Sequence, residues 1–325
     1  MKKNIFIIGG CGFLGLELTK IMPFKDYKIF IVDKKFKKNL CSKKASFLDC
    51  DIIDEDSVNN LPIKKNDIII NLASRQYQDK VPLINKTKWF EEVNYLGAKY
   101  LFNKSLKAKA SKYIFFSSDM VYGIPKKFPV KEDYSLNPIG PYGKSKLKTE
   151  KFLQKNEYKD ISIVIFRSRL ISGPGRLGVF KKIFKLIYNS LPIPIIGNGK
   201  NYYQMISVYD CANAILKVVD KDIKSNVFNL GSENLIKVNN LIKGLNHHAT
   251  SKSKIINIKP ILIYPILYLL NYTGYPILYP EQFNIADKNI ILDISKSKKI
   301  LNWKPKYGDL EMIKKAYDSW IVLPK

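Results

Sequence analysis

Short apolar runs alternate with longer amphipathic stretches through the first half of the chain. The runs are rich in Ile, Val and Phe, and the stretches between them carry apolar residues at helical spacing. Such an alternation is typical of parallel strands joined by crossover helices, so the predicted fold class is α/β. The predicted strands are residues 4–8, 28–32, 45–48, 67–72, 112–117 and 161–167. The predicted helices between them are residues 13–22, 87–107 and 142–155.

The pattern loosens in the second half of the chain. After Gly173-Pro174-Gly175, shorter helices and proline-bounded segments predict a smaller mixed lobe. We expect one unit over residues 1–170 and a second over 171–325, with residues 200–232 crossing back to the first.

Residues 261–280 are the longest stretch that resembles a membrane segment, because they carry no charge. Three prolines and a glycine interrupt them, which is unfavourable for a membrane-spanning helix. The segment therefore predicts a short buried helix followed by a loop. Contact with a membrane surface is the alternative.

A glycine-rich turn follows the first predicted strand directly. Gly9, Gly12 and Gly15 have the spacing at which glycines allow a tight turn, close approach to a pyrophosphate, and close packing of helix on strand. Asp33 ends the second strand, where a carboxylate accepts hydrogen bonds from an adenosine ribose and repels a 2′-phosphate. These features predict a Rossmann-type doubly wound sheet that binds NAD, although Lys34 and Lys35 leave NADP open. The alternative is that the glycines serve the turn alone.

Two residues of the third predicted helix suggest proton chemistry. Tyr142 and Lys146 lie one helical turn apart on the same face. Free tyrosine has a pKa of about 10, so a tyrosine that acts as a base at neutral pH needs a lowered pKa. A neighbouring ammonium group lowers the pKa of a tyrosine. Taken alone, this spacing is common on helices. A buried strand upstream ends in Ser117-Ser118-Asp119.

Together these motifs resemble the extended short-chain dehydrogenase/reductase family, in particular its NAD-dependent nucleotide-sugar epimerases and dehydratases. The resemblance spans nearly the whole chain. The matching motifs are the glycine turn, Asp33, Asp51-Ile52, Asn71-Leu72-Ala73-Ser74, Asn94 with Gly97, Ser117-Ser118-Asp119, Tyr142 with Lys146, Gly173-Pro174-Gly175, Gly197-Asn198-Gly199, Val208-Tyr209-Asp210, Asp293, and Leu301-Asn302-Trp303-Lys304-Pro305.

The resemblance implies a role for each matching residue. Tyr142 is the expected base, Lys146 its activator and a ligand of the nicotinamide ribose, and Ser118 the group that polarises the reacting oxygen. The expected cofactor-binding residues are Gly9, Gly12, Phe13, Leu14, Gly15, Asp33, Asp51, Ile52, Leu72, Ala73, Ser74, Asn94 and Lys146. The expected substrate-binding residues are Ser118, Asp119, Tyr142, Arg169 and Tyr203. A homodimer through helices 87–107 and 142–155 is also implied.

The chain departs from the family at several positions. Met120 follows Asp119 where related 4,6-dehydratases carry a Glu, which disfavours dehydration. Ser168 and Leu170 replace the usual Pro and Asn, and Tyr203 falls where an Arg usually binds the nucleotide diphosphate. Losing that Arg weakens the case for an ordinary UDP- or dTDP-sugar. The cations that would compensate are Arg169, Arg176, Lys181 and Lys200.

The leading hypothesis is an NAD-dependent epimerase of a nucleotide-activated sugar, with residues 264–279 as a lid over the substrate cleft. The alternative is an NAD(P)-dependent reductase or dehydrogenase that acts on a ketosugar or a hydroxysteroid-like lipid. An NAD sensor without catalysis is a third hypothesis. The sequence does not identify the sugar or the nucleotide.

Charge and cysteine content argue against a nucleic-acid partner, disulfide bonds and a metal site. The 325 residues include 55 Lys and Arg against 28 Asp and Glu, a net charge of +27. All but four of these basic residues are Lys, whereas nucleic-acid readers rely on the planar fork of Arg, so no nucleic-acid partner is expected. The four Cys have no disulfide or metal spacing, and His247 and His248 are adjacent. We therefore expect no metal site and a reducing cytoplasmic location.

Overall fold

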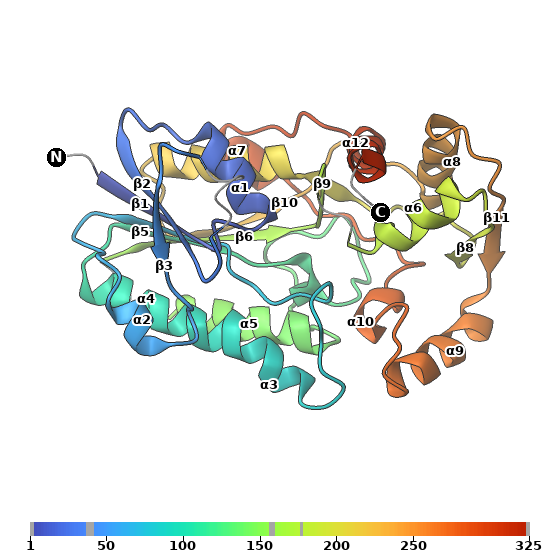
Figure 1. Ribbon diagram of the computed structural model, residues 1–325, viewed down its shortest axis with the longest axis horizontal. Coiled ribbons are helices and arrows are strands. Elements are labelled where there is room, and N and C mark those ends of the chain that lie inside the picture. Colours follow the sequence, from blue (N-terminus) through green and yellow to red (C-terminus); the bar gives the residue numbers. More distant parts are fainter. Residues whose placement is uncertain (1–2, 37–41, 156–159, 176–177, 323–325) are drawn as a thin grey trace.

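Seven parallel strands form the central sheet of the computed structural model, which describes residues 3–36, 42–155, 160–175 and 178–322 (Figure 1). Their order across the sheet is β10-β6-β5-β4-β1-β2-β3. The strands are β1 (Lys3–Ile8), β2 (Tyr27–Asp33), β3 (Ser46–Asp49), β4 (Ile68–Asn71), β5 (Lys112–Phe116), β6 (Ser162–Ser168) and β10 (Asn226–Leu230). The strand order changes direction beside β1, which opens a crevice at the carboxyl ends of the strands. The predicted Rossmann-type fold is confirmed.

Helices cover both faces of this sheet (Figure 1). One face carries α1 (Phe13–Ile21) and α7 (Val208–Asp220), and the other carries α2 (Glu55–Asn59), α4 (Ala98–Lys107) and α5 (Pro141–Leu153). Each layer encloses its own apolar core. The first core includes Leu14, Leu18 and Val218, and the second includes Val93, Leu101, Phe102 and Leu153.

The six predicted strands are present, and none of their ends differs from the prediction by more than one residue. The predicted helix over 87–107 is wrong in one respect, because it is not a continuous α-helix. It divides into α3 (Lys86–Glu91), the π-helical segment η1 (Glu92–Gly97) and α4. A π segment changes which side chains face inward, and such segments are frequent at functional sites.

The second half of the chain adds small elements beside the sheet. The pairs β7 (Leu170–Ser172) with β9 (Met205–Ser207), and β8 (Ile193–Ile196) with β11 (Ile255–Ile258), are both parallel. A third core, which includes Phe184 and Trp320, joins α6 (Phe180–Tyr188), α8 (Val238–His248) and α12 (Asp309–Val322). The remaining elements are the 3₁₀-helix η2 (Asp119–Tyr122), α9 (Pro260–Tyr272), α10 (Pro280–Phe283) and α11 (Ser295–Leu301).

The prediction of a short buried helix within 261–280 is wrong in its burial. The helix exists as α9, but Leu267 is its one buried residue. Ile261 is 79% exposed and Tyr272 is 82% exposed. The sequence of α9 is apolar on every side and therefore carries no signal of which side faces solvent. None of the described helices is long and apolar enough to cross a membrane.

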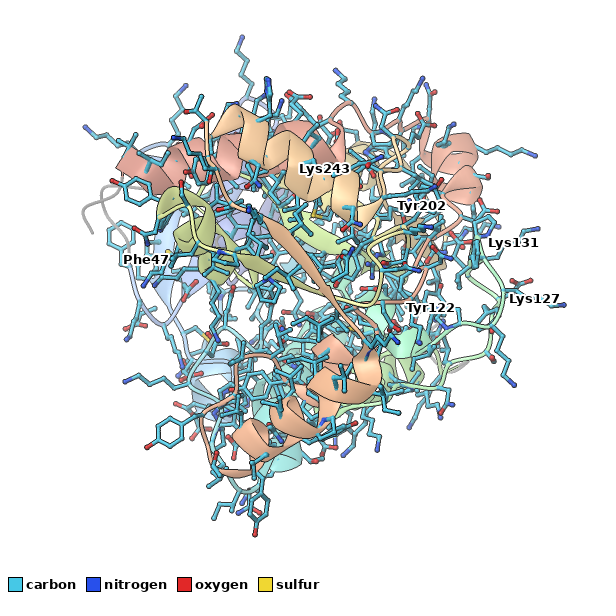
Figure 2. All side chains as sticks on the ribbon, turned by 90° about the vertical axis from the view of Figure 1, so that its right-hand side faces the viewer. Phe47, Tyr122, Lys127, Lys131, Tyr202 and Lys243 are labelled. Carbon is cyan, nitrogen blue, oxygen red and sulfur yellow. The ribbon has the colours of Figure 1, made fainter. Side chains whose placement is uncertain are left out.

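Many of the lysines lie on the outer surface. Lys127 and Lys131, on the loop after η2, extend away from the body of the molecule (Figure 2). Their long stems and charged ends need no partner in this position, because water solvates them.

Candidate functional site

The glycine turn joins β1 to α1 at the carboxyl edge of the sheet. Gly9 has a φ of +73°, and a Cβ there would lie 2.8 Å from the backbone nitrogen of Ala73. A Cβ at Gly15 would lie 2.6 Å from Cα of Gly10. Both positions therefore require glycine. Among the described residues no side chain caps α1, and its first turn, which begins with Phe13 and Leu14, lies at the carboxyl edge of the sheet.

Asp33 closes the turn from the end of β2. Its Oδ2 accepts a hydrogen bond from the backbone N–H of Cys11 at 3.0 Å. On the neighbouring strand end, Asp51 Oδ2 lies 3.5 Å from Nζ of Lys34. Ile52 is buried, and its Cγ1 lies 2.7 Å from the position that a Cβ on Gly97 would occupy. The structure thus brings Asp33, Asp51 and Ile52 to one edge of the crevice.

Asn94 links the loop after β4 to α5. Its side chain is fully buried in η1. The Oδ1 atom accepts hydrogen bonds from Ser74 Oγ (3.1 Å) and Arg75 N (2.8 Å). The Nδ2 group donates to Ser145 Oγ (2.9 Å) and to the carbonyl of Arg75 (3.2 Å). Asn94 therefore positions the segment of Leu72, Ala73 and Ser74, and its side-chain hydrogen bonds go to protein groups.

The helix α5 carries Tyr142 and Lys146. Lys146 is 2% exposed, and its Nζ donates to the carbonyl of Phe116 at 2.9 Å. Burial lowers the pKa of Lys146 to about 7, and the carboxylate of Glu150 opposes that shift. Tyr142 is half-buried at the N-terminal end of the same helix. The Lys146 ammonium thus reaches under the helix toward β5, with little solvent around it.

A second buried ion pair supports this helix, and sequence reasoning missed it. Arg167 Nη2 lies 2.7 Å from Glu150 Oε2, and Arg167 Nε also donates to both carboxylate oxygens. Ser117 Oγ donates to Oε1 of Glu150. Both charged groups are at least 98% buried, so the pair holds α5, β5 and β6 in one arrangement. The sequence shows one sign of this pair, because Arg167 directly follows the apolar run of β6.

Ser118, Asp119, Arg169 and Tyr203 also come together. Ser118 caps η2, and its Oγ accepts a hydrogen bond from Met120 N at 3.2 Å. Asp119 forms a buried ion pair with Arg169. The Arg169 guanidinium lies 4.7 Å from the ring centre of Tyr203, and its Nε donates to the carbonyl of Gln204. Within the described part of the chain, Nη2 of Arg169 has no hydrogen-bond partner.

Two of the other expected cations lie at the surface of the described structure. Lys181 and Lys200 are exposed at the surface. Arg176 lies outside the described residues, as does Cys41. Leu170 begins β7, directly after Arg169.

Glu281 is a further buried acid that sequence reasoning missed. It lies on α10, and its Oε1 accepts a hydrogen bond from the backbone N–H of Gly143 at 2.8 Å. Its Oε2 accepts from the hydroxyl of Tyr77 at 2.5 Å. Burial raises the pKa of Glu281 to about 7. The Tyr77 ring lies 6.1 Å from the ring of Tyr142, so Glu281 supports both the N-terminus of α5 and an aromatic neighbour of the expected base.

Two glycines leave the space that Glu281 needs for this contact. A Cβ at Gly140 or at Gly143 would lie 2.6 Å from a carboxylate oxygen of Glu281. The sequence shows these glycines, but Glu281 is 138 residues from Gly143 along the chain. A contact of that separation has no local pattern that would reveal it.

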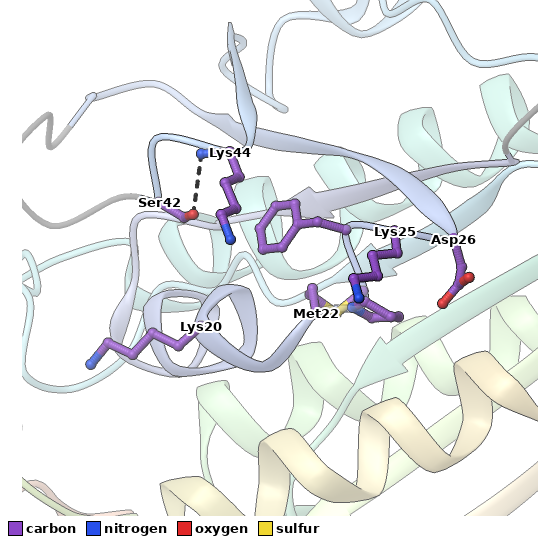
Figure 3. A pocket seen from close by; sticks show the side chains of 8 residues that line it. Lys20, Met22, Lys25, Asp26, Ser42 and Lys44 are labelled. Atoms are coloured by element: carbon purple, nitrogen blue, oxygen red, sulfur yellow. Dashed lines mark hydrogen bonds between the residues drawn. The ribbon is translucent and has the colours of Figure 1, made fainter.

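A separate hollow lies away from this site (Figure 3). Its volume is about 410 Å³, and Lys20, Lys25 and Lys44 contribute to its lining. It lies where α1 ends and β2 begins, so it opens at the amino edge of the sheet. The site residues gather at the carboxyl edge. We assign no role to this hollow.

The sequence model of the NAD-dependent epimerase/dehydratase family matches residues 5–231. This match includes the glycine turn, Asp33, and the Ser118, Tyr142 and Lys146 positions. The chain belongs to that family. The expected family resemblance is therefore confirmed.

Characterised relatives are similar to this family member over most of its length. A UDP-glucose 4-epimerase of Lactobacillus helveticus is 26% identical over 98% of this chain and 96% of its own. A dTDP-D-glucose 4,6-dehydratase of Dictyostelium discoideum is 30% identical over 71% of this chain and 58% of its own. Both activities of the family are thus represented among its relatives.

Solved structures share its fold. A UDP-glucose 4-epimerase of Thermotoga maritima, solved with UDP-glucose, superposes with a TM-score of 0.78 and 24% identity, and the match covers 98% of both chains. A UDP-glucose 4-epimerase of Thermus thermophilus, solved with NAD, gives a TM-score of 0.77 at 18% identity over 98% of this chain and 99% of its own.

Proposed function

We propose that the protein is an NAD-dependent 4-epimerase of a nucleotide-activated sugar. The observation that supports this proposal is the packing of α5, which carries Tyr142 and Lys146, against the end of β5 and against η2, which Ser118 caps. Buried Lys146 donates to the carbonyl of Phe116, and a Cβ on Gly143 would lie 2.7 Å from the carbonyl oxygen of Met120. Asp33 closes the glycine turn at the same edge of the sheet. The relatives that act on UDP-sugars support the substrate class. Residues 1–170 would hold the cofactor, and residues 171–325 would contribute most of the substrate contacts.

The residues of the crevice fit NAD. The uncapped N-terminus of α1 offers N–H groups and positive potential to a pyrophosphate, with Gly9, Gly12, Phe13, Leu14 and Gly15 forming the wall. Asp33 suits the hydroxyls of an adenosine ribose. Lys34, one of the two lysines that could favour a 2′-phosphate, lies 3.5 Å from Asp51, which supports NAD over NADP. Asp51 and Ile52 would contact the adenine, and Leu72, Ala73 and Ser74 the nicotinamide half.

The chemistry follows from the proposed roles of three side chains. Bound NAD would accept a hydride from the reacting sugar carbon and later return it. Tyr142 takes the proton of the sugar hydroxyl, and Lys146 stabilises the resulting negative charge. Ser118 donates a hydrogen bond to the reacting oxygen. The sugar becomes a ketone and turns over. It then recovers the hydride on its other face while Tyr142 returns the proton to the oxygen, so no net oxidation occurs.

Arg169 and Tyr203 are the proposed substrate contacts that distinguish this chain. Asp119 neutralises part of the Arg169 charge, but Nη2 of Arg169 keeps a donor without a partner among the described residues. A buried donor of this kind is costly unless a ligand meets it. We assign it to an oxygen of the substrate.

Epimerisation is proposed over 4,6-dehydration because the chain lacks a second acid after Ser118. Met120 occupies that position, and Asp119 is engaged by Arg169. The dehydratase relative makes this a point for experiment.

A homodimer through α4 and α5 is also proposed. Tyr95 of η1 and Phe152 of α5 form an edge-to-face pair on this outer layer and remain half-buried. A second copy packed there would cover both rings.

The experiment is a panel of UDP-, dTDP- and GDP-sugars incubated with the purified protein and with Tyr142→Phe. We expect conversion of at least one sugar to its C4 epimer without accumulation of NADH. We expect Tyr142→Phe to be slower by roughly 10²–10⁴-fold. Stoichiometric NADH would indicate a dehydrogenase, loss of water a dehydratase, and inactivity on every sugar would contradict the proposed substrate class.

A further inference from the structure

The outer side of α9 is apolar, the reverse of what a surface helix normally shows. Leu262, Ile266 and Leu269 are spaced by one helical turn and lie on one side of the helix.

 Leu262, Ile266 and Leu269 are 63%, 53% and 61% exposed, and Tyr272 is 82% exposed. In a surface helix these positions are usually polar, and the apolar ones face the core. Four large apolar side chains on the solvent side therefore indicate an interaction surface.

The apolar surface continues beyond the helix. Tyr275, in the loop after α9, is 79% exposed, and Ile84, before α3, is 74% exposed. The two segments lie together, because Leu83 lies 3.7 Å from the position of a Cβ on Gly274. We call this surface the α9 patch and define it as Ile84, Leu262, Ile266, Leu269, Tyr272 and Tyr275. It lies at one end of the molecule, beside α10 and away from the central sheet (Figure 1).

Lysines border the α9 patch, while residues 260–280 themselves carry no charge. Lys86 Nζ donates to the side-chain oxygen of Asn271 at 3.1 Å, and Lys182 Nζ donates to the carbonyl of Ile277 at 2.8 Å. These oxygens are neutral, so neither contact pairs the lysine with an anion. Lys259 directly precedes the helix. A hollow of about 560 Å³ next to the patch is lined in part by Lys86 and Lys88.

We propose that the α9 patch docks on the surface of an anionic lipid bilayer, with α9 lying in the plane of the interface. Interfacial helices place apolar and aromatic side chains among the lipids and lysines toward the head groups. Tyrosines such as Tyr272 and Tyr275 favour this boundary. The 13 residues of α9 are too few to span a bilayer, which needs about 20.

Charge favours a bilayer over a second copy of the chain. A two-fold contact through the α9 patch would bring the same surface of both copies together. Lys86, Lys182 and Lys259 of each copy would then face like charges, in a protein whose net charge is +27. An anionic bilayer supplies the opposite charge to these lysines.

Docking would also orient the candidate site. The loop after α9 leads to Tyr279, whose ring stacks on Tyr77 at 4.5 Å. Tyr77 contacts Glu281 and lies next to Tyr142. The N-terminal end of α5 would therefore lie close to the bilayer. The docking proposal does not depend on the proposed reaction, because its test measures binding alone.

The test is sedimentation of the full chain with phosphatidylcholine vesicles, with and without phosphatidylglycerol. We expect binding to the anionic vesicles that weakens with added salt. The double variant Ile266→Ser/Leu269→Ser should weaken this binding by about tenfold or more, since each exposed side chain loses its transfer into the interface. The matched control, Leu235→Ser/Ile300→Ser, changes exposed apolar residues elsewhere and should bind as the parent does.

Two further measurements distinguish an anionic bilayer from a second copy of the chain as the partner of the α9 patch. Lys86→Gln/Lys182→Gln should weaken binding to anionic vesicles only. The molecular mass of the parent and of Ile266→Ser/Leu269→Ser, measured by light scattering, should agree. A smaller mass for that variant would assign the α9 patch to a second copy and overturn the proposal. Absence of vesicle binding, or equal binding by that variant and the control, would also overturn it.

Discussion

Burial shifts the pKa values of the charged residues around α5 in opposite directions. It lowers the pKa of Lys146 to about 7 and raises the pKa of Glu281 to about 7. Both shifts follow from the cost of placing a charge away from water. A lysine close to its titration range is able to respond to the charge on a neighbouring tyrosine. The electrostatics of the candidate site thus depend on packing as much as on the identity of its residues.

Glu281 should make the stability of the protein depend on pH. Its pKa is about 7 in the folded protein against an ordinary 4.5, so between these values the folded state retains a proton that the unfolded state loses. Stability therefore falls as the pH rises through this window. Glu281→Gln removes the dependence, and its free energy of unfolding relative to the parent should rise by up to about 3 kcal/mol from pH 4.5 to pH 7.5.

Urea unfolding at a series of pH values measures this difference. Glu311→Gln, at an exposed position on α12, is the matched control and should follow the parent at every pH. Parallel curves for Glu281→Gln and the parent would show that Glu281 does not titrate in this range.

At the scale of elements, η1 and the loop after β4 depend on one side chain. Asn94 makes four hydrogen bonds from a fully buried position. Asn94→Ala leaves the N–H of Arg75 and the hydroxyl of Ser145 without this partner. We expect a loss of about 2–4 kcal/mol in the free energy of unfolding, measured by urea denaturation.

Two variants refine this expectation. Asn94→Asp keeps the acceptor but loses the donor, so its cost should be large as well. Asn103→Ala, at an exposed position on α4, should cost less than about 0.5 kcal/mol. A cost for Asn94→Ala as small as that of Asn103→Ala would contradict the positioning role.

The elements with a strong local pattern were predictable from the sequence, and those that depend on distant partners were not. The six strands and α5 have continuous apolar runs or helical spacing. The strand β10 has Asn226 and Asn229 among its five residues, so it lacks a continuous apolar run, and it joins the sheet by pairing with β6. The π-helical segment η1 contains Asn94 with its buried hydrogen bonds to distant residues, and no sequence spacing reveals these bonds.

The same limit applies to the candidate site. Gly9, Asp33, Tyr142 and Lys146 stand in recognisable local motifs. Glu281 does not, because it reaches α5 from far along the chain. The burial of α9 was mispredicted because a uniformly apolar helix gives the same pattern whether it faces a core or solvent.

At the scale of the whole molecule, the two halves of the chain share one sheet. The strand β10 pairs with β6, and α7 covers the same face as α1. Both come from the second half. Residues 1–170 alone would expose the edge of β6 and the apolar face under α7. We expect this fragment to show no cooperative urea transition by circular dichroism, whereas the full chain should show one.

A fragment that unfolds cooperatively, with the stability of the full chain, would mean that the first half folds alone. The comparison of the two proteins under one set of conditions is its own control.

The central claim is that a hydride leaves one sugar carbon and returns to the same carbon within one site. The most direct measurement is the fate of deuterium placed on C4 of a nucleotide sugar that the protein converts. The account predicts that the C4 epimer retains the deuterium, that no NADH accumulates, and that Tyr142→Phe gives little product. Loss of the deuterium to solvent, or its appearance in released NADH, would contradict the account.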